Sequence, residues 1–235
     1  SAVLPGQGHY YNPDFIIDGI KKRIDGYVTS ITTNLALDWL KNKRKKDQPF
    51  LLLYHQKAPH RNWKPEEKYL SLFDDKTFDP PANFFDDYSN RGTAAKTQEM
   101  LIAASEKQIE VAHGNGGHGR WGHDFKMLKD PYGNNTGFER ELKRFSPEQK
   151  SAWLDAYTPK NEAMISQNLE GKELALWKFN RYIKDYLRTI QSVDDGVGEI
   201  LDYLDQEGLT ENTIVVYTSD QGFYLGEHGW FDKRF

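Results

Sequence analysis

Residues 214–222 have the sequence IVVYTSDQG, in which four consecutive apolar residues are followed by a polar turn. An uninterrupted apolar run of this length is typical of a strand covered on both faces, as in a parallel sheet flanked by helices. In such sheets the functional side chains gather where the strands end. The stretch therefore predicts an α/β fold with a mainly parallel central sheet, and it places Asp220 and Gln221 at the end of a strand.

The segments on either side of this stretch along the chain support the same fold. Between about residues 177 and 206 apolar side chains recur at helical spacing, and Gly208 is well placed to end that helix. A second apolar run, residues 50–54, predicts another buried strand, and Lys57 and His60 follow it. Because parallel strands of one sheet end at the same edge, we expect Lys57 and His60 to converge with Asp220.

The remaining regions are less regular. Residues 9–26 predict a β-hairpin, and a helix is expected from about residue 32 to residue 41. The basic run at 43–46 is best interpreted as solvated charge at the end of that helix. Residues 61–170 predict a long insertion with short helices over the site, so residues 1–235 are expected to form part of a single catalytic domain.

Composition excludes several classes of protein. The net charge of the 235 residues is -4, which argues against nucleic acid as a partner. There are no cysteines, so disulfides, thiolate metal sites and a cysteine nucleophile are excluded within this stretch. No apolar run approaches the roughly 18 residues of a membrane span.

The polar residues after the strand ends indicate chemistry on an anion. Asp220 offers a carboxylate and Gln221 a carbonyl oxygen, both suited to a hard cation such as calcium or magnesium, although two ligands do not complete a site. For a bare Ser-Asp-Gln-Gly, a turn in which Asp220 caps the next segment would be the favoured interpretation, but the residues downstream favour a site. Downstream, His228 and Lys233 lie on a glycine-flanked loop, where cationic donors can neutralise charge in a transition state. Together these residues predict one edge of a metal-dependent site for cleaving an anionic ester.

Three segments, residues 57–60, 181–204 and 214–233, resemble the type I sulfatases of the alkaline-phosphatase-like superfamily. The opening GQGHYYNP at 6–13 is most similar to bacterial N-acetylglucosamine-6-sulfatases and mucin-desulfating sulfatases. The resemblance implies a calcium-dependent sulfuric ester hydrolase that removes sulfate from a sulfated sugar, with 6-sulfated N-acetylglucosamine as the expected substrate. It also implies export to the periplasm or the cell exterior.

The resemblance assigns roles to individual residues. It implies that Asp220 and Gln221 are calcium ligands. It implies that Lys233 binds the sulfate oxygens and that His60 contacts sulfate and protonates the leaving alcohol. His228 falls in the loop where family members often contact the substrate, and Lys57 is also expected to contact it.

The chain also departs from the family pattern. Type I sulfatases oxidise a Cys or Ser in a C/S-x-P-x-R signature to formylglycine, the nucleophile, and no such signature occurs here. The paired aspartates that complete the family's calcium site, its later strands and its small C-terminal subdomain are not recognisable either. The chain therefore resembles a middle piece of a sulfatase that is inactive alone, with the formylglycine expected upstream. Two alternatives stay open: a phosphomonoesterase or phosphodiesterase of the same superfamily, and a non-catalytic glycan-binding module.

Other polar clusters are interpreted conservatively. His113, His118 and His123 are five residues apart in a glycine-rich stretch, which favours a surface loop over a zinc site. Asp194 and Asp195 are expected to be solvated helix charges or to pair locally with Arg188 or Lys184. Residues 86–91, including Asp86 and Asp87, are expected to form a surface loop.

Overall fold

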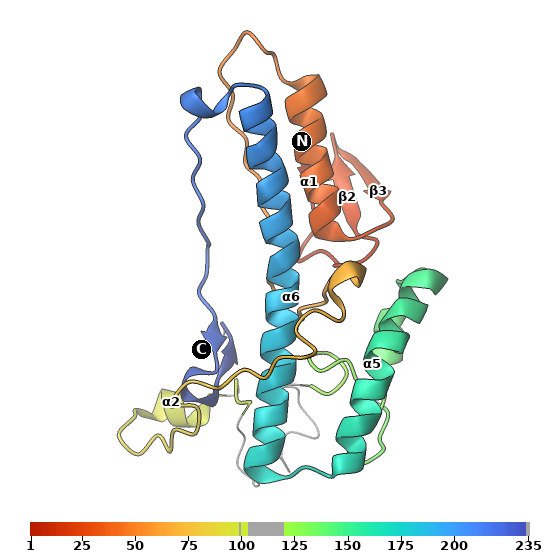
Figure 1. Ribbon diagram of the computed structural model, residues 1–235, viewed down its shortest axis with the longest axis vertical. Coiled ribbons are helices and arrows are strands. Elements are labelled where there is room, and N and C mark those ends of the chain that lie inside the picture. The colour runs from red at the N-terminus through yellow and green to blue at the C-terminus, as the bar shows by residue number, and fades with distance from the viewer. Residues whose placement is uncertain (99, 103–119, 234–235) are drawn as a thin grey trace. The chain divides into compact units, whose positions relative to one another are not determined.

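The computed structural model describes residues 1–98, 100–102 and 120–233 (Figure 1). The chain divides into two compact units, and each is described by itself. Unit 1 comprises residues 1–69 and 186–217, and unit 2 comprises residues 70–185 and 218–235. The long helix α6, Gly171–Gln206, contributes its first part to unit 2 and its second part to unit 1.

Unit 1 begins with a three-stranded antiparallel sheet of β1 (Ala2–Val3), β2 (Asp14–Ile17) and β3 (Ile20–Arg23), in the order β1-β2-β3. Asp18 and Gly19 join β2 to β3 with φ values of 48° and 86°. Positive φ at both central residues is what a tight type I′ turn requires, and an Asp-Gly pair adopts it readily. The predicted hairpin is therefore confirmed.

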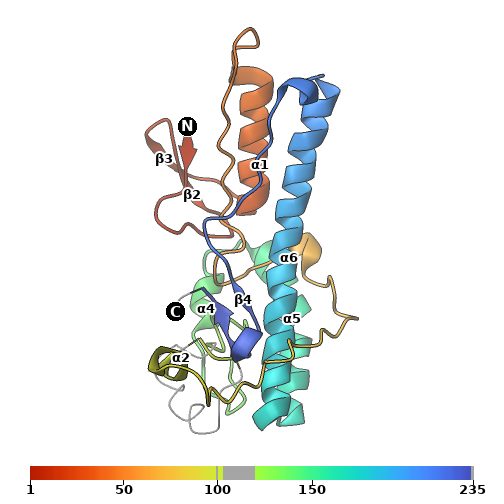
Figure 2. The same cartoon turned by 90° about the vertical axis from the view of Figure 1, so that its left-hand side faces the viewer.

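The helices of unit 1 are α1 (Val28–Asp38), the π-helical turn η1 (Trp39–Lys43), the 3-10 turns η2 (Glu67–Tyr69) and η3 (Thr210–Asn212), and the second part of α6. Helices α1 and α6 lie side by side in both views (Figures 1 and 2). Gly196 of α6 permits the close approach, because a Cβ there would lie 2.5 Å from the Tyr54 hydroxyl and would also overlap Thr33 of α1. Thr33 and Tyr54 hydrogen bond to each other at 2.6 Å.

The two predicted buried strands differ from expectation. Residues 50–54 and 214–217 form extended coil and pair with no strand among the described residues, whose ladders are all antiparallel. Leu51 is 80% exposed and Ile214 is 93% exposed. A ladder needs a neighbouring backbone about 4.8 Å away, and no described segment supplies one for either run. The parallel pairing predicted for these two runs is thus not present among the described residues, although the apolar character of the runs is that of sheet strands.

Unit 2 contains α2 (Thr93–Thr97), α4 (Phe138–Leu142), α5 (Pro147–Gln167) and the first part of α6. A small antiparallel pair, β4 (Tyr224–Leu225) and β5 (Phe231–Asp232), encloses the 3-10 turn η4 (Glu227–Gly229). Phe125, Met127, Met164 and Leu174 form a buried apolar cluster in this unit.

The insertion is more structured than predicted, since α5 is a helix of 21 residues. Its N-terminus carries a complete capping box in which Ser146 and Gln149 satisfy each other's backbone N–H groups, and Pro147 occupies the first turn. This sequence signal favours a helix start. Polar residues and Pro159 dilute the apolar periodicity of α5, which is why the pattern did not reveal it.

Helix α6 is confirmed and ends as predicted. Gly208 has a φ of 63°, and the Leu209 N–H donates to the Leu204 carbonyl at 2.8 Å. Glycine reverses the chain there without the steric cost of a Cβ. Within the described ranges, none of the helices combines the length and apolar character needed to cross a bilayer.

Candidate functional site

His60 lies in a loop that three tyrosine hydroxyls hold in place. Tyr10 donates to the His60 carbonyl at 2.6 Å, Tyr11 to the Pro65 carbonyl at 2.6 Å and Tyr27 to the Lys64 carbonyl at 2.9 Å. The tyrosine rings pack on one another and are buried, and burial raises the pKa of Tyr10 and Tyr27 well above the usual value, so they stay neutral donors. The loop that carries His60 is therefore anchored at several main-chain points.

The His60 ring has a defined orientation. Its Nδ1 lies 2.6 Å from the Arg61 carbonyl oxygen. A carbonyl can only accept a hydrogen bond, so Nδ1 carries the proton of the neutral ring. Proton exchange with a substrate would then take place at Nε2.

Lys57 lies in the same unit as His60. Its Nζ donates to the Gln7 carbonyl at 2.9 Å and lies 4.7 Å from the centroid of the Tyr10 ring. Partial burial lowers the pKa of Lys57 to about 8, and the nearby Lys64 ammonium acts in the same direction. The His60 N–H donates to the Lys57 carbonyl, so one tight turn places both side chains in the same loop.

Asp220 and Gln221 lie on an exposed turn of unit 2. The Ser219 hydroxyl donates to the Gln221 carbonyl at 2.7 Å and accepts from the Gln221 N–H at 3.3 Å. These bonds shape the turn through the backbone and Ser219. The Asp220 carboxylate and the Gln221 side-chain amide face solvent.

His228 lies on the loop between β4 and β5, and several unit 2 segments fix this loop. A Cβ on Gly226 would approach Phe179 of α6 to 2.7 Å and Pro81 to 2.9 Å, so only glycine fits there. The His228 Nδ1 lies 2.6 Å from the Asp86 carboxylate, and the Tyr88 hydroxyl donates to the His228 carbonyl.

Lys233 directly follows β5 and is half-buried. Its position is set by the pairing of β4 with β5 and by the Phe231 N–H, which donates to the Met100 carbonyl at 3.0 Å. The six predicted residues thus fall into two groups. Lys57 and His60 belong to unit 1, while Asp220, Gln221, His228 and Lys233 belong to unit 2. Their convergence at one site stays a prediction.

Comparison with protein families identifies the chain. The model of the family described as Sulfatase matches residues 4–234. The chain belongs to the sulfatase family. This confirms the resemblance seen in the short segments and extends it over nearly the whole sequence.

Several relatives and one solved structure support the assignment. The sulfatase chain is 44% identical over 240 residues to the N-acetylglucosamine-6-O-sulfatase of Bacteroides thetaiotaomicron, with all of this chain and 40% of the relative covered. It is 26% identical over 146 residues to the choline-sulfatase of Rhizobium meliloti, covering 58% of this chain and 28% of that protein. A protein solved in complex with its substrate D-glucosamine-2-N,6-O-disulfate matches with a TM-score of 0.86 and 41% identity, over 100% of this chain and 46% of that one.

These matches confirm the alkaline-phosphatase-like α/β fold class. They also show that the sulfatase chain spans less than half the length of the relatives it matches.

Family membership implies use of a metal ion. Asp220 and Gln221 offer two adjacent hard oxygens on an exposed turn, which is the donor type that calcium and magnesium prefer. Calcium takes six to eight oxygens. Among residues 1–98, 100–102 and 120–233, no three His, Cys, Asp or Glu side chains are grouped to hold a metal ion. The two residues are donors of the kind that such an ion takes, and they would supply only part of its shell.

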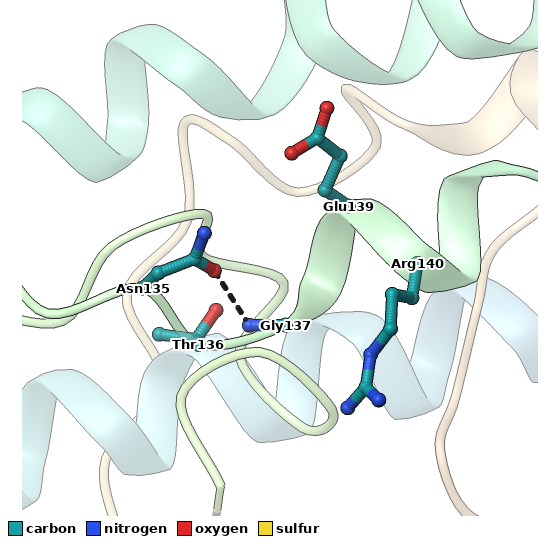
Figure 3. Close-up of a pocket in the computed structure, with 5 residues that line it drawn as sticks. All are labelled: Asn135, Thr136, Gly137, Glu139 and Arg140. Atoms are coloured by element: carbon teal, nitrogen blue, oxygen red, sulfur yellow. Dashed lines mark hydrogen bonds between the residues drawn. The ribbon is translucent and has the colours of Figure 1, made fainter.

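A shallow pocket in unit 2 is lined by residues 135–137, Glu139 and Arg140 (Figure 3). The Gly137 N–H donates to the Asn135 side chain at 2.9 Å, a local turn at the start of the short helix α4. None of the six predicted residues lines this pocket.

The remaining histidines and acidic residues singled out in the sequence lie outside the six predicted site residues. His113 and His118 lie outside the described residues, and His123 pairs with Asp124 at 2.8 Å. The structure shows Asp195 to accept hydrogen bonds from Lys68 at 2.9 Å and from Tyr69. These two partners are 127 and 126 residues away in sequence, and a third, Gln191, is local and donates at 3.2 Å, so none of them is the predicted Arg188 or Lys184.

Sequence reasoning missed Asp86. It was interpreted as part of a surface loop, yet its carboxylate binds the ring of His228, 142 residues further along the chain. No local periodicity or motif indicates such a contact. The only signal was the dense charge of residues 86–91.

Proposed function

We propose that this chain is part of a sulfatase that hydrolyses the 6-O-sulfate ester of a glucosamine-type sugar. The observation that carries the proposal is the match over the whole chain to a protein solved with a 6-O-sulfated glucosamine, together with 44% identity to an N-acetylglucosamine-6-O-sulfatase. Export to the periplasm or cell exterior is part of the proposal, by analogy with glycan-directed members of the family.

His60 is proposed as the general acid. Because Nδ1 donates to the Arg61 carbonyl, the ring can release a proton from Nε2 only after it becomes an imidazolium. Imidazole changes protonation near neutral pH, which suits a group that must donate to a departing sugar alkoxide and then be reprotonated. The tyrosine-anchored loop would keep Nε2 in place during this transfer.

Lys233 is proposed to bind the sulfate oxygens, and Lys57 and His228 to contact the substrate. A half-buried ammonium held by β5 can stabilise negative charge that grows on sulfate in the transition state. Asp220 and Gln221 would hold a calcium ion, which when bound supplies Lewis-acid stabilisation of the sulfate oxygens. The nucleophile is proposed to be a formylglycine outside residues 1–235.

The role of His60 can be tested through the leaving group. In the full-length protein, His60→Ala should lower sulfate release from 6-O-sulfated N-acetylglucosamine by about 100-fold or more, the usual contribution of general acid catalysis. The loss on an aryl sulfate should be clearly smaller, because a phenolate departs without full protonation. Equal losses on both substrates would exclude His60 as the acid.

The role of Lys233 can be tested by charge removal. Lys233→Ala in the full-length protein should lower kcat by about 100-fold, the usual cost of losing one oxyanion-stabilising group. Lys46→Ala removes an exposed ammonium in unit 1 and serves as the matched control. Unchanged sulfate release in both His60→Ala and Lys233→Ala would overturn the site assignment. Faster turnover of an aryl phosphate than of an aryl sulfate would instead favour phosphoester hydrolysis.

A further inference from the structure

His228 adopts a left-handed backbone conformation, which is unfavourable for a residue with a side chain. Its φ is 58° and its ψ is 20°, in the left-handed region that glycine occupies most easily. Glycines stand at positions 226 and 229 of the same loop, with φ of 112° and 73°, yet position 228 carries an imidazole. A strained non-glycine residue persists where its surroundings hold it, and such residues cluster at functional sites.

The surroundings that hold His228 come from residues 83–88 and from Trp230. The Asp86 Oδ2 lies 2.6 Å from Nδ1 of the ring. The Tyr88 hydroxyl donates to the His228 carbonyl, which fixes the main chain on the other side of the residue. Trp230 packs against the imidazole with 5.2 Å between ring centroids, and Tyr88 stacks on Trp230 at 5.9 Å.

The neighbours of Asp86 favour its ionised form, which accepts hydrogen bonds from N–H groups. The Tyr88 main-chain N–H, the His228 ring and Arg91 together lower the pKa of the Asp86 carboxyl below its usual range. Its Oδ1 accepts the Tyr88 N–H at 2.9 Å, while Arg91 Nη2 lies 3.1 Å from Oδ2. An ionised carboxylate has no proton to donate, so the bond to His228 requires a proton on Nδ1. The amide of Asn83 lies 3.4 Å from both ring nitrogens.

We propose that Asp86 is a positioning residue for the sulfatase reaction, which holds His228 as the Nδ1–H form and thereby presents Nε2 to the sugar. This inference rests on the proposed function and on the substrate contact proposed for His228. In this proposal, residues 83–88 of the insertion fix the conformation of the loop between β4 and β5 on the side that faces the substrate. In this proposal Asp86 acts on the reaction through its hydrogen bond to His228.

The kinetic test uses four variants of the full-length protein with 6-O-sulfated N-acetylglucosamine. Asp86→Asn keeps the shape of the side chain but no longer specifies which ring nitrogen is protonated. It should raise KM about tenfold with a smaller change in kcat, since a hydrogen bond to a charged group contributes roughly a factor of ten. Asp87→Asn is the matched control and should leave both constants unchanged.

A double-mutant cycle separates positioning from a structural role. In a His228→Ala background, Asp86→Asn should add less than about a twofold loss, because its target is already gone. An undiminished loss in that background, or unchanged kinetics in Asp86→Asn alone, would overturn the inference while leaving the proposed function intact. An inactive wild-type protein would instead count against the proposed function.

A measurement without turnover tests the same point. With 15N-labelled histidine in the full-length protein, the His228 resonances are assigned by their loss in His228→Ala. In the wild type they should report a proton on Nδ1 and none on Nε2 at high pH, and in Asp86→Asn this preference should be lost. A wild-type ring protonated on Nε2 alone would contradict the proposal whatever the activity.

Discussion

At the scale of single residues, two buried lysines of unit 2 have different partners for their ammonium groups. Lys126 forms an ion pair with Asp185 at 2.9 Å, and both side chains are fully buried. Lys178 is also buried, but its ammonium packs on the Trp121 ring at 4.6 Å and on Phe125 at 5.9 Å. Aromatic faces attract a cation but compensate for lost hydration less than a carboxylate does. Burial lowers the pKa of both lysines, and it lowers that of Lys178 to about 8.

The pKa of Lys178 leads to a prediction about stability and pH. The unfolded chain has a lysine pKa near 10.4, so between about pH 8 and pH 10.4 the unfolded chain binds more protons than the folded one. The contribution of Lys178 to the free energy of unfolding is therefore lowest below pH 8, and it rises as the pH increases from about 8 to about 10.4. Lys178→Met should raise the free energy of unfolding at pH 7 by about 2 kcal/mol, with a gain that shrinks towards pH 10.

Urea unfolding of the full-length protein at pH 7 and pH 10 measures this change. Lys143→Met, an exposed position in the same unit, controls for the loss of a positive charge. A Lys178→Met protein that is less stable at pH 7 would mean that the contacts with Trp121 and Phe125 outweigh the cost of burial.

At the scale of elements, the contact of α1 with α6 in unit 1 depends on a residue without a side chain. Gly196 faces the hydrogen-bonded hydroxyls of Thr33 and Tyr54, and a Cβ added at this position would have no room. Gly198, one half-turn further, has no heavy atom within 4 Å of its Cβ position. The same substitution at these two positions therefore has opposite consequences.

Gly196→Ala should destabilise the protein by about 1–3 kcal/mol, because the helices must separate or break the Thr33–Tyr54 hydrogen bond. Gly198→Ala should stabilise it by about 0.5–1 kcal/mol, since alanine loses less backbone entropy in a helix. Thermal and urea unfolding of the two variants give the comparison directly. Equal effects at both positions would show that the helices do not meet at Gly196.

At the scale of the whole molecule, we expect metal binding to differ between residues 1–235 alone and the full-length protein. As the proposed ligands, Asp220 and Gln221 would supply two oxygens, and calcium takes at least six. We expect residues 1–235 alone to bind calcium weakly and to release no sulfate. In the full-length protein, calcium at 100 times its Kd should raise the free energy of unfolding by about 2.7 kcal/mol.

Calorimetry on the two proteins, with Asp220→Asn in the full-length one, checks this expectation. The substitution should weaken calcium binding, because a neutral amide replaces the only carboxylate among the two proposed ligands. Tight stoichiometric binding by residues 1–235 alone would place the site elsewhere in the chain.

Much of the local structure was predictable because local chemistry decides it. The Asp-Gly turn between β2 and β3, the apolar stripe of α6 and Gly208 at its end each depend on neighbours within a few residues. The polar turn at Asp220 and Gln221 follows from Ser219 and the residues beside it in the same way. Helix α5 could have been found from its Ser146 capping box, but weak periodicity concealed it.

Contacts between distant residues depend instead on the tertiary structure. The carboxylates of Asp86 and Asp195 find partners 126 to 142 residues away, and no spacing in the sequence encodes such distances. The runs at 50–54 and 214–217 have the composition of sheet strands, but pairing depends on which backbone lies beside them. Local sequence patterns and short-range hydrogen bonds thus determined many of the elements, and the segments at 57–60, 181–204 and 214–233 indicated the family. Packing alone decided that Asp86 meets His228 and that Gly196 faces Thr33.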